Sequence, residues 1–191
     1  MVPAVYDFDL AQTGVLSTRL REKGLTTFAE ACTFVQGLPY RRPTGPASSI
    51  MVLDQACGTC SSKHALLAGL AEEAERSDCE LTLGYLQLNE SNSPGIGPIL
   101  RRYSLPSIPE AHCYLRTRGV RNDFTGLPPG SVRLVDSVTR EEPIDIDSLH
   151  TDKRRRHERY LLAWATEREI PAELTWTARE AWIKHLSTAL A

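Results

Sequence analysis

Residues 54–73 have the sequence DQACGTCSSKHALLAGLAEE, in which a short cysteine-containing turn comes directly before an amphipathic helix. Thr59 is a suitable N-cap residue, which makes Cys60 the first residue of the helix. The pattern predicts a helix that packs into the core and carries a cysteine at its N-terminus. The residues expected on its buried face recur at helical spacing and are Leu67, Leu70, Ala71 and Ala74.

A cysteine at this position is expected to be reactive. Unpaired N–H groups and the helix dipole favour a thiolate at a helix N-terminus, and can lower a cysteine pKa from about 8.5 toward neutrality. Since the thiolate is the nucleophilic form, Cys60 is a candidate nucleophile. Its backbone N–H and the amide of Gln55 are candidate donors to an oxyanion, although Gln55 could instead end a strand and bond the turn.

The segment at residues 111–126, AHCYLRTRGVRNDFTG, is typical of a β-hairpin. A short connection containing Gly119 separates its two strands. If the turn is centred between Thr117 and Arg118, His112 faces Asp123. Facing side chains have Cβ atoms about 4.5 to 5.5 Å apart, so the carboxylate could accept a hydrogen bond from the imidazole. A one-residue slip would turn Asp123 to the other face, so the pair depends on this register.

Cys60, His112 and Asp123 would together supply a nucleophile, a base and a residue that orients the base. With these residues in place, the chain resembles the transglutaminase-like superfamily of papain-type cysteine enzymes. The resemblance covers roughly residues 27–126. It is carried by GTCSSK at 58–63 with the following helix, the strand around 81–88, His112 at the head of a strand, and DFTG at 123–126.

The resemblance implies a catalytic triad of Cys60, His112 and Asp123. The thiolate would attack a carboxamide or peptide carbonyl, and water or an amine would resolve the thioester. Cys113 and Tyr114 follow His112, where many members of the superfamily have a tryptophan. This departure affects the substrate rather than the triad. Members cross-link proteins, hydrolyse amides, cleave peptides or have lost activity, so the expected substrate is a peptide, a protein or a small amide.

Three other interpretations fit parts of the same sequence. The first is a catalytically silent module that uses the cleft to bind a peptide or protein. The second is dithiol redox chemistry at the C-x-x-C motif of residues 57–60, although the Pro- and Arg-rich segment before it does not fit a thioredoxin fold. The third is a metal site, although structural zinc sites have two close ligand pairs. Its potential ligands would be Cys57, Cys60, His64, His112 and Cys113. We expect neither a metal nor a cofactor.

Two regions are candidates for the walls of the cleft. His64 lies four residues after Cys60, so it is expected to line the cleft or pack against it, or to replace His112 as the base without a carboxylate partner. The segment at 89–110 is long for a connection, and loops of that length are commonly functional or disordered. Its residues Arg101, Arg102 and Tyr103 could contact substrate, and the alternative is a mobile surface insertion.

The composition argues against several classes of partner. A net charge of -2 over 191 residues does not suit a general binder of nucleic acids or anionic membranes. The longest apolar stretch, near 65–71, is too short to span a bilayer, and the N-terminus lacks the pattern of a signal peptide. The 5 cysteines form an odd set without framework spacing, which suits a reducing compartment. The cytoplasm is therefore expected.

The order of the predicted elements, helices first and antiparallel strands after them, indicates the α+β class. Thr27 and Glu30 form a capping box for a helix over 28–37. We expect short strands over 6–10, 81–88, 112–117, 120–125 and 133–138. Residues 1–150 would form one catalytic core, in which the N-terminal helices pack on the sheet.

Residues 151–191 are predicted to form a helical hairpin that extends this core. One helix would cover 152–169, Pro171 would break it, and Thr177 with Glu180 would cap the last helix. The basic run at 153–159 could contact an acidic partner or RNA, but such a run is usually a solvated face. The tryptophans are expected to anchor the hairpin on the core or at a homodimer interface: Trp164, Trp176 and Trp182.

Overall fold

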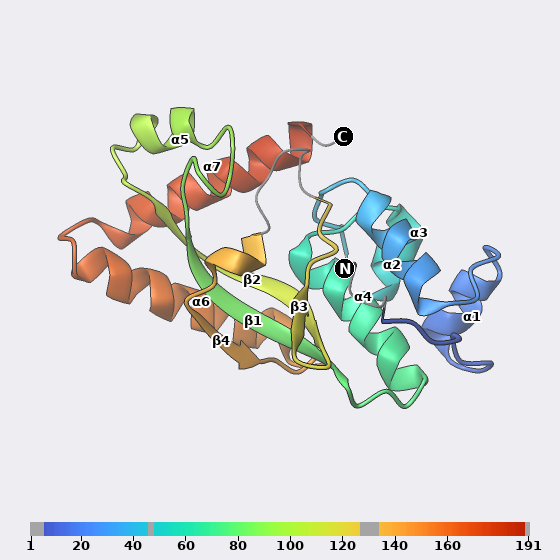
Figure 1. Cartoon of the computed structure of the whole chain (residues 1–191). Coiled ribbons are helices and arrows are strands. Elements are labelled where there is room, and N and C mark those ends of the chain that lie inside the picture. Colours follow the sequence, from blue (N-terminus) through green and yellow to red (C-terminus); the bar gives the residue numbers. More distant parts are fainter. Residues whose placement is uncertain (1–5, 46–47, 127–133, 190–191) are drawn as a thin grey trace. The chain divides into compact units, whose positions relative to one another are not determined.

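The computed structural model describes residues 6–45, 48–126 and 134–189 (Figure 1). The described residues form seven α-helices, a 3-10 helix and four strands in the order β3-β2-β1-β4, and the pairs β1–β4 and β2–β3 are antiparallel. The predicted α+β class is therefore confirmed. None of the described helices is both long and apolar enough to cross a membrane.

The chain divides into two compact units. The first contains the residues up to Leu81 and Tyr114–Gly126, and the second contains Thr82–Cys113 and the chain after Gly126. This division differs from the predicted one at residue 150, because the C-terminal helices share a unit with the segment Thr82–Cys113. Within the second unit, a buried ion pair joins Glu110 to Arg179, and the local sequence pattern does not reveal this contact.

Helix α4 (Cys60–Glu73) forms the centre of the first unit. Helices α1 (Val15–Arg21), α2 (Phe28–Gly37) and α3 (Ile50–Gln55) pack against it. All side chains at residues 63–71 are buried, so α4 is enclosed on every side and does not have the solvent-exposed face of the amphipathic helix predicted. Its Glu73 accepts the backbone N–H groups of Leu16 and Ser17 at 2.9 and 2.7 Å, which places a carboxylate at the positive end of α1.

The predicted capping box of α2 is confirmed. The Glu30 N–H donates to Thr27 Oγ1 at 3.3 Å, and the Thr27 N–H donates to Glu30 Oε2 at 3.0 Å. The predicted strand at 6–10 is wrong, because only Asp9 in this segment forms a β-bridge, with Thr27. Aromatic packing holds the segment in place, since the Phe8 and Phe28 rings stack with centroids 4.6 Å apart.

The hairpin forms, but with a different register from the predicted one. Strands β2 (Ile108–Thr117) and β3 (Val120–Asn122) pair Leu115 with Asn122 and Thr117 with Val120. Arg118 and Gly119 make the turn with φ of 48° and 79°, as the two-residue turn of a tight hairpin requires. The predicted turn centre was one residue too early. Asp123 therefore follows the end of β3 and does not face His112 in a strand pair.

The second unit contains most of β1 (Cys79–Leu88), which begins in the first unit and pairs with β4 (Arg140–Pro143). The predicted long loop at 89–110 is wrong, because it contains helix α5 (Gly97–Arg102) and the start of β2. The predicted strand at 133–138 is also wrong. Leu134–Ser137 is a 3-10 helix, and residue 133 lies outside the described residues. Strand β4 was not predicted.

The predicted C-terminal helical hairpin is confirmed. Helices α6 (Leu149–Thr166) and α7 (Ala172–Ala189) pack side by side, as the orange and red ribbons of Figure 1 show. The predicted cap at Thr177 is wrong, since its hydroxyl donates to the Glu173 carbonyl at 2.8 Å inside the helix. The helix instead starts after Pro171, whose carbonyl accepts the N–H groups of Leu174 and Thr175.

Candidate functional site

Cys60 is the first residue of α4, as the sequence predicts, and is 4% exposed. The first turn of the helix is closed by hydrogen bonds from the Thr59 N–H to Ser62 Oγ at 2.9 Å and from the Lys63 N–H to the Thr59 carbonyl at 3.0 Å. Gly58, in the turn before the helix, forms a parallel bridge with Tyr40. The local structure therefore holds the Cys60 thiol at the positive end of the helix dipole.

His64, four residues after Cys60, is fully buried. Its Nε2 accepts the Phe124 N–H at 2.8 Å, so this nitrogen carries no proton. Its Nδ1 lies 2.8 Å from the Cys60 carbonyl oxygen and must therefore be the donor in that bond. Both ring nitrogens of this neutral tautomer are occupied. His64 thus packs beside the candidate nucleophile and has no free lone pair with which to take its proton.

Asp123 lies in the loop at residues 123–125, which follows β3. Its Oδ1 accepts the Thr125 N–H at 2.9 Å and the Thr125 hydroxyl at 2.5 Å. The same oxygen lies 3.6 Å from His64 Nε2. Through Phe124 and His64, the 123–125 loop is joined to the first two turns of α4. The structure therefore brings Cys60, His64 and Asp123 together within the first unit.

Lys63 lies between Cys60 and His64 in the helix sequence and is also fully buried. Its Nζ donates to the Leu38 carbonyl at 2.5 Å and to the Thr125 carbonyl at 2.7 Å. Burial lowers the pKa of Lys63 to about 8, although the negative charges of Asp123, Cys57 and Cys60 act in the opposite direction. In the sequence, Lys63 was singled out only as part of the GTCSSK motif at residues 58–63. The signal in the sequence was a lysine shortly before the apolar run at residues 65–71.

The side chain of Gln55 is bonded to the loop before α3. Its Oε1 accepts the Thr44 N–H at 2.9 Å, and its Nε2 donates to the Thr44 carbonyl at 2.7 Å. Gln55 is also the last residue of helix α3, whereas the sequence suggested the end of a strand. This geometry gives Gln55 a role in bracing the loop.

The other predicted site residues belong to the second unit. His112 is buried in β2. Arg101 is exposed in the last turn of α5, and Tyr103 follows this helix with its ring 5.4 Å from the Arg102 guanidinium carbon. The predicted roles of His112, Arg101 and Tyr103 remain predictions.

The described residues contain no group of three or more His, Cys, Asp or Glu side chains that could hold a metal ion. None of the 5 cysteines, all of which lie in the described residues, forms a disulfide, and this includes Cys57 and Cys60 of the C-x-x-C motif. Burial raises the pKa of Cys32 far above its ordinary value and that of Cys79 to about 12. These two thiols are therefore weak nucleophiles at neutral pH.

Comparisons with protein-family models, curated proteins and solved structures found no match to this chain. The resemblance to the transglutaminase-like superfamily therefore stays a prediction, based on the quoted motifs.

Proposed function

We propose that this chain is a transglutaminase-like cysteine enzyme that performs acyl transfer or hydrolyses an amide or peptide bond through a thioester on Cys60. The observation that carries the proposal is the position of Cys60 at the N-terminus of the 14-residue helix α4. The helix dipole favours a thiolate there. The buried Lys63, three residues further along, adds a positive charge to the same part of the unit.

In the proposed reaction, the Cys60 thiolate attacks the carbonyl carbon of a peptide, a protein side-chain amide or a small amide. The carbon–nitrogen bond breaks, and the amine leaves with a proton. Water or a second amine then attacks the thioester and releases the thiolate. The Cys60 backbone N–H is a suitable oxyanion donor, since such donors must point at the developing charge.

His112 is proposed as the residue that carries the proton, and Asp123 as the residue that orients His112. Both roles rest on the family resemblance alone, because the observed register of β2 and β3 does not form the strand pair that the sequence predicted for His112 and Asp123. His64 is not proposed as the base, because hydrogen bonds from Phe124 and to Cys60 occupy its two ring nitrogens. The expected compartment is the cytoplasm, since reducing conditions keep the thiols free.

The second candidate function is a catalytically silent module that binds a peptide or protein. The observation that favours it is the burial of Cys60, which is only 4% exposed. A nucleophile must be reached by its substrate, whereas a structural cysteine behaves as a small apolar side chain.

The pH dependence of iodoacetamide alkylation at Cys60, followed by peptide mass mapping, distinguishes the two functions. We expect Cys60 of the parent protein to react well below about pH 8, and His112→Ala to lose this low-pH reactivity, because a thiolate–imidazole pair is then broken. His150→Ala is the matched control, since His150 is exposed at the start of α6. Cys32 and Cys79 are internal references in the same digest.

An inert Cys60, or one that reacts like an ordinary thiol in the parent and in His112→Ala, would contradict the enzyme proposal and support the binding module. Normal low-pH reactivity in His112→Ala would keep Cys60 as the nucleophile but would remove His112 as its base. Activated Cys60 would justify a screen of glutamine-containing peptides and small amides as acyl donors.

A further inference from the structure

Lys63 is the fully buried lysine of α4, and its ammonium group contacts two backbone carbonyls from distant segments. The Leu38 carbonyl comes from the residue after α2, and the Thr125 carbonyl comes from the 123–125 loop. Transfer of a lysine charge out of water is costly unless hydrogen bonds and opposite charges compensate for it. A methionine would avoid the cost of the buried charge, but it would leave the Leu38 and Thr125 carbonyls without the hydrogen bonds from Lys63.

The surrounding backbone leaves room for this side chain. A Cβ atom on Gly58 would lie 2.8 Å from Lys63 Cγ, which is closer than real Cβ contacts. Gly126 has a φ of 74°, and a Cβ atom there would lie 3.5 Å from Lys63 Nζ and would collide with the Gln36 carbonyl. Glycines thus lie at both ends of the lysine side chain, in the turn before α4 and directly after the 123–125 loop.

The charged and titratable groups that act on Lys63 in the first unit come from three segments. Cys60 is on its own helix, Cys57 is in the turn before this helix, and Asp123 follows β3. Cys60 and Lys63 are three residues apart in α4, a spacing that places side chains on the same face of a helix, and both are buried. The negative forms of all three groups raise the pKa of Lys63, against the larger effect of burial. Electrostatic attraction is mutual, so the Lys63 ammonium stabilises a negative charge on these groups in return.

We propose that Lys63 is a positioning residue of the candidate site. Its side chain holds the 123–125 loop against α4, and its buried positive charge stabilises the Cys60 thiolate. The inference rests on the proposed function, because it requires that Cys60 react as a thiolate. The Lys63 ammonium group is a second source of positive potential beside the helix dipole, and water cannot screen its charge because the side chain is buried. The alternative role is a purely structural brace between Leu38 and Thr125, which would leave the titration of Cys60 unchanged.

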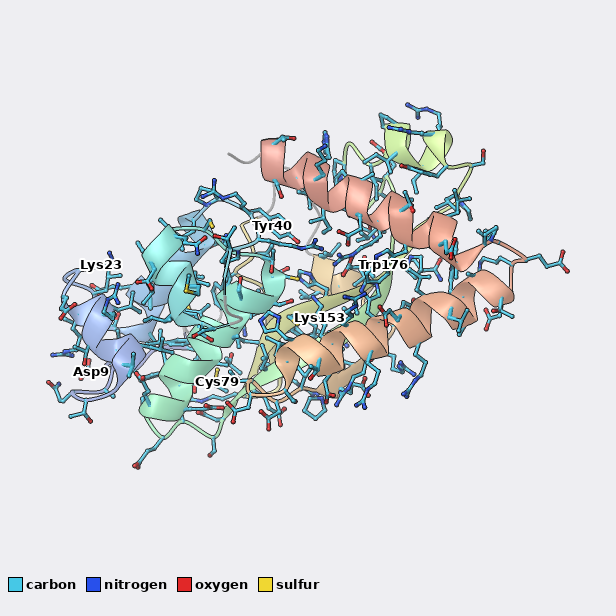
Figure 2. The ribbon with its side chains drawn as sticks, turned by 180° about the vertical axis from the view of Figure 1, so that it is seen from behind. Asp9, Lys23, Tyr40, Cys79, Lys153 and Trp176 are labelled. Atoms are coloured by element: carbon cyan, nitrogen blue, oxygen red, sulfur yellow. The ribbon has the colours of Figure 1, made fainter. Side chains whose placement is uncertain are left out.

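The test compares the pH midpoint of Cys60 alkylation in the parent, Lys63→Met, Lys63→Arg and Lys23→Met. Lys23 is an exposed lysine of the same unit, in the turn after α1 (Figure 2), so Lys23→Met is a matched control. We expect Lys63→Met to raise the midpoint by about one pH unit, so that alkylation near pH 6.5 slows about tenfold. Lys63→Arg retains the charge and should stay closer to the parent. The rate of Cys60 alkylation at high pH, where the thiol is fully ionised, should not change. This rate depends on access to the thiolate and not on the pH at which it forms.

Two outcomes separate this inference from the proposed function. If Cys60 is activated in the parent and Lys63→Met keeps the same midpoint, the inference about Lys63 is wrong and the proposed function stands. If Cys60 behaves as an ordinary thiol in the parent, both are wrong.

A second measurement does not depend on the folding of Lys63→Met. The titration of the Lys63 Nζ group can be followed by NMR in lysine-labelled parent protein and in Cys60→Ser. We expect Lys63 to lose its proton at a lower pH in Cys60→Ser, because the serine hydroxyl does not become negative. The same titration curve in both proteins would overturn the inference.

Discussion

The hydrogen bonds of the buried His64 side chain decide which of its two ring nitrogens carries the proton. The Phe124 N–H can only donate, which makes Nε2 an acceptor and leaves the proton on Nδ1. The sequence indicated that His64 lies near Cys60, through the four-residue spacing. It could not indicate Phe124 as a partner, because no local pattern specifies a residue 60 positions away.

We expect His64→Leu to destabilise the protein by about 1–3 kcal/mol, because it leaves the Phe124 N–H without its acceptor inside the unit. The measurement is urea unfolding followed by far-UV circular dichroism. His150→Leu is the matched control on an exposed histidine and should change the free energy of unfolding by no more than about 0.5 kcal/mol. Equal effects of the two substitutions would show that the bond to Phe124 contributes nothing to stability.

At the scale of elements, the hairpin turn decides where Asp123 lies. The two positive φ angles at Arg118 and Gly119 fix a two-residue turn, and this turn fixes the pairing of β2 with β3. The sequence predicted a hairpin here, but a shift of one residue in the turn centre was enough to place Asp123 in the loop after β3. Short strands contain too few side chains to define their register.

We expect Gly119→Ala to destabilise the protein by about 1 kcal/mol, because its φ of 79° is unfavourable for a residue with a Cβ atom. Gly37→Ala is a matched control. Neither site has an atom within 4 Å of the added Cβ, and Gly37 is a helical residue without a positive φ. Gly37→Ala should be neutral or stabilising by a few tenths of a kcal/mol. Thermal unfolding of both variants measures the difference, and similar effects would argue against strain in the turn.

At the scale of the whole chain, Glu110 and Arg179 join segments 69 positions apart within the second unit. The Arg179 guanidinium donates to both Glu110 oxygens, at 2.9 and 3.1 Å, and both side chains are buried. Their neighbour His157, on α6, donates from Nε2 to the Pro109 carbonyl oxygen at 3.0 Å. Its ring lies 5.3 Å from that of Trp176, which is labelled in Figure 2. This cluster ties both C-terminal helices to β2.

We expect Arg179→Met to destabilise the protein by about 3–5 kcal/mol, since it leaves the Glu110 carboxylate buried without its partner. The double variant Glu110→Gln with Arg179→Met should recover a large part of this loss, because neither charge then remains. Chemical unfolding of the two single variants and the double variant gives the coupling energy. If the double variant loses as much free energy of unfolding as the two single variants added together, Glu110 and Arg179 do not interact directly.

The buried pair of Glu110 and Arg179 should also make the stability of the protein depend on pH. Burial raises the pKa of Glu110, but the charges of Arg179 and His157 outweigh it and hold the pKa well below the ordinary value of 4.5. A lowered carboxyl pKa stabilises the fold above 4.5, and this contribution is lost as the pH falls below that value. The stability of the double variant should therefore fall less steeply than that of the parent on acidification below about pH 4.5.

The sequence by itself determined the elements that depend on neighbouring residues. The capping box of Thr27 and Glu30, the start of α4 at Cys60 and the break at Pro171 are local signals, and each marks an element that forms. The continuous strand β1 and the C-terminal hairpin were predicted from apolar patterns of the same kind.

Only the tertiary structure decided which polar groups are buried and what they contact. Lys63 and His64 follow Cys60 in the sequence as ordinary polar residues, yet both are enclosed and bonded to the 123–125 loop. Glu110 lies in a segment predicted as a loop, yet it is buried and paired with Arg179. The physical reason is that burial and pairing depend on residues brought together from distant parts of the chain, whereas helix starts and breaks depend on a few adjacent ones.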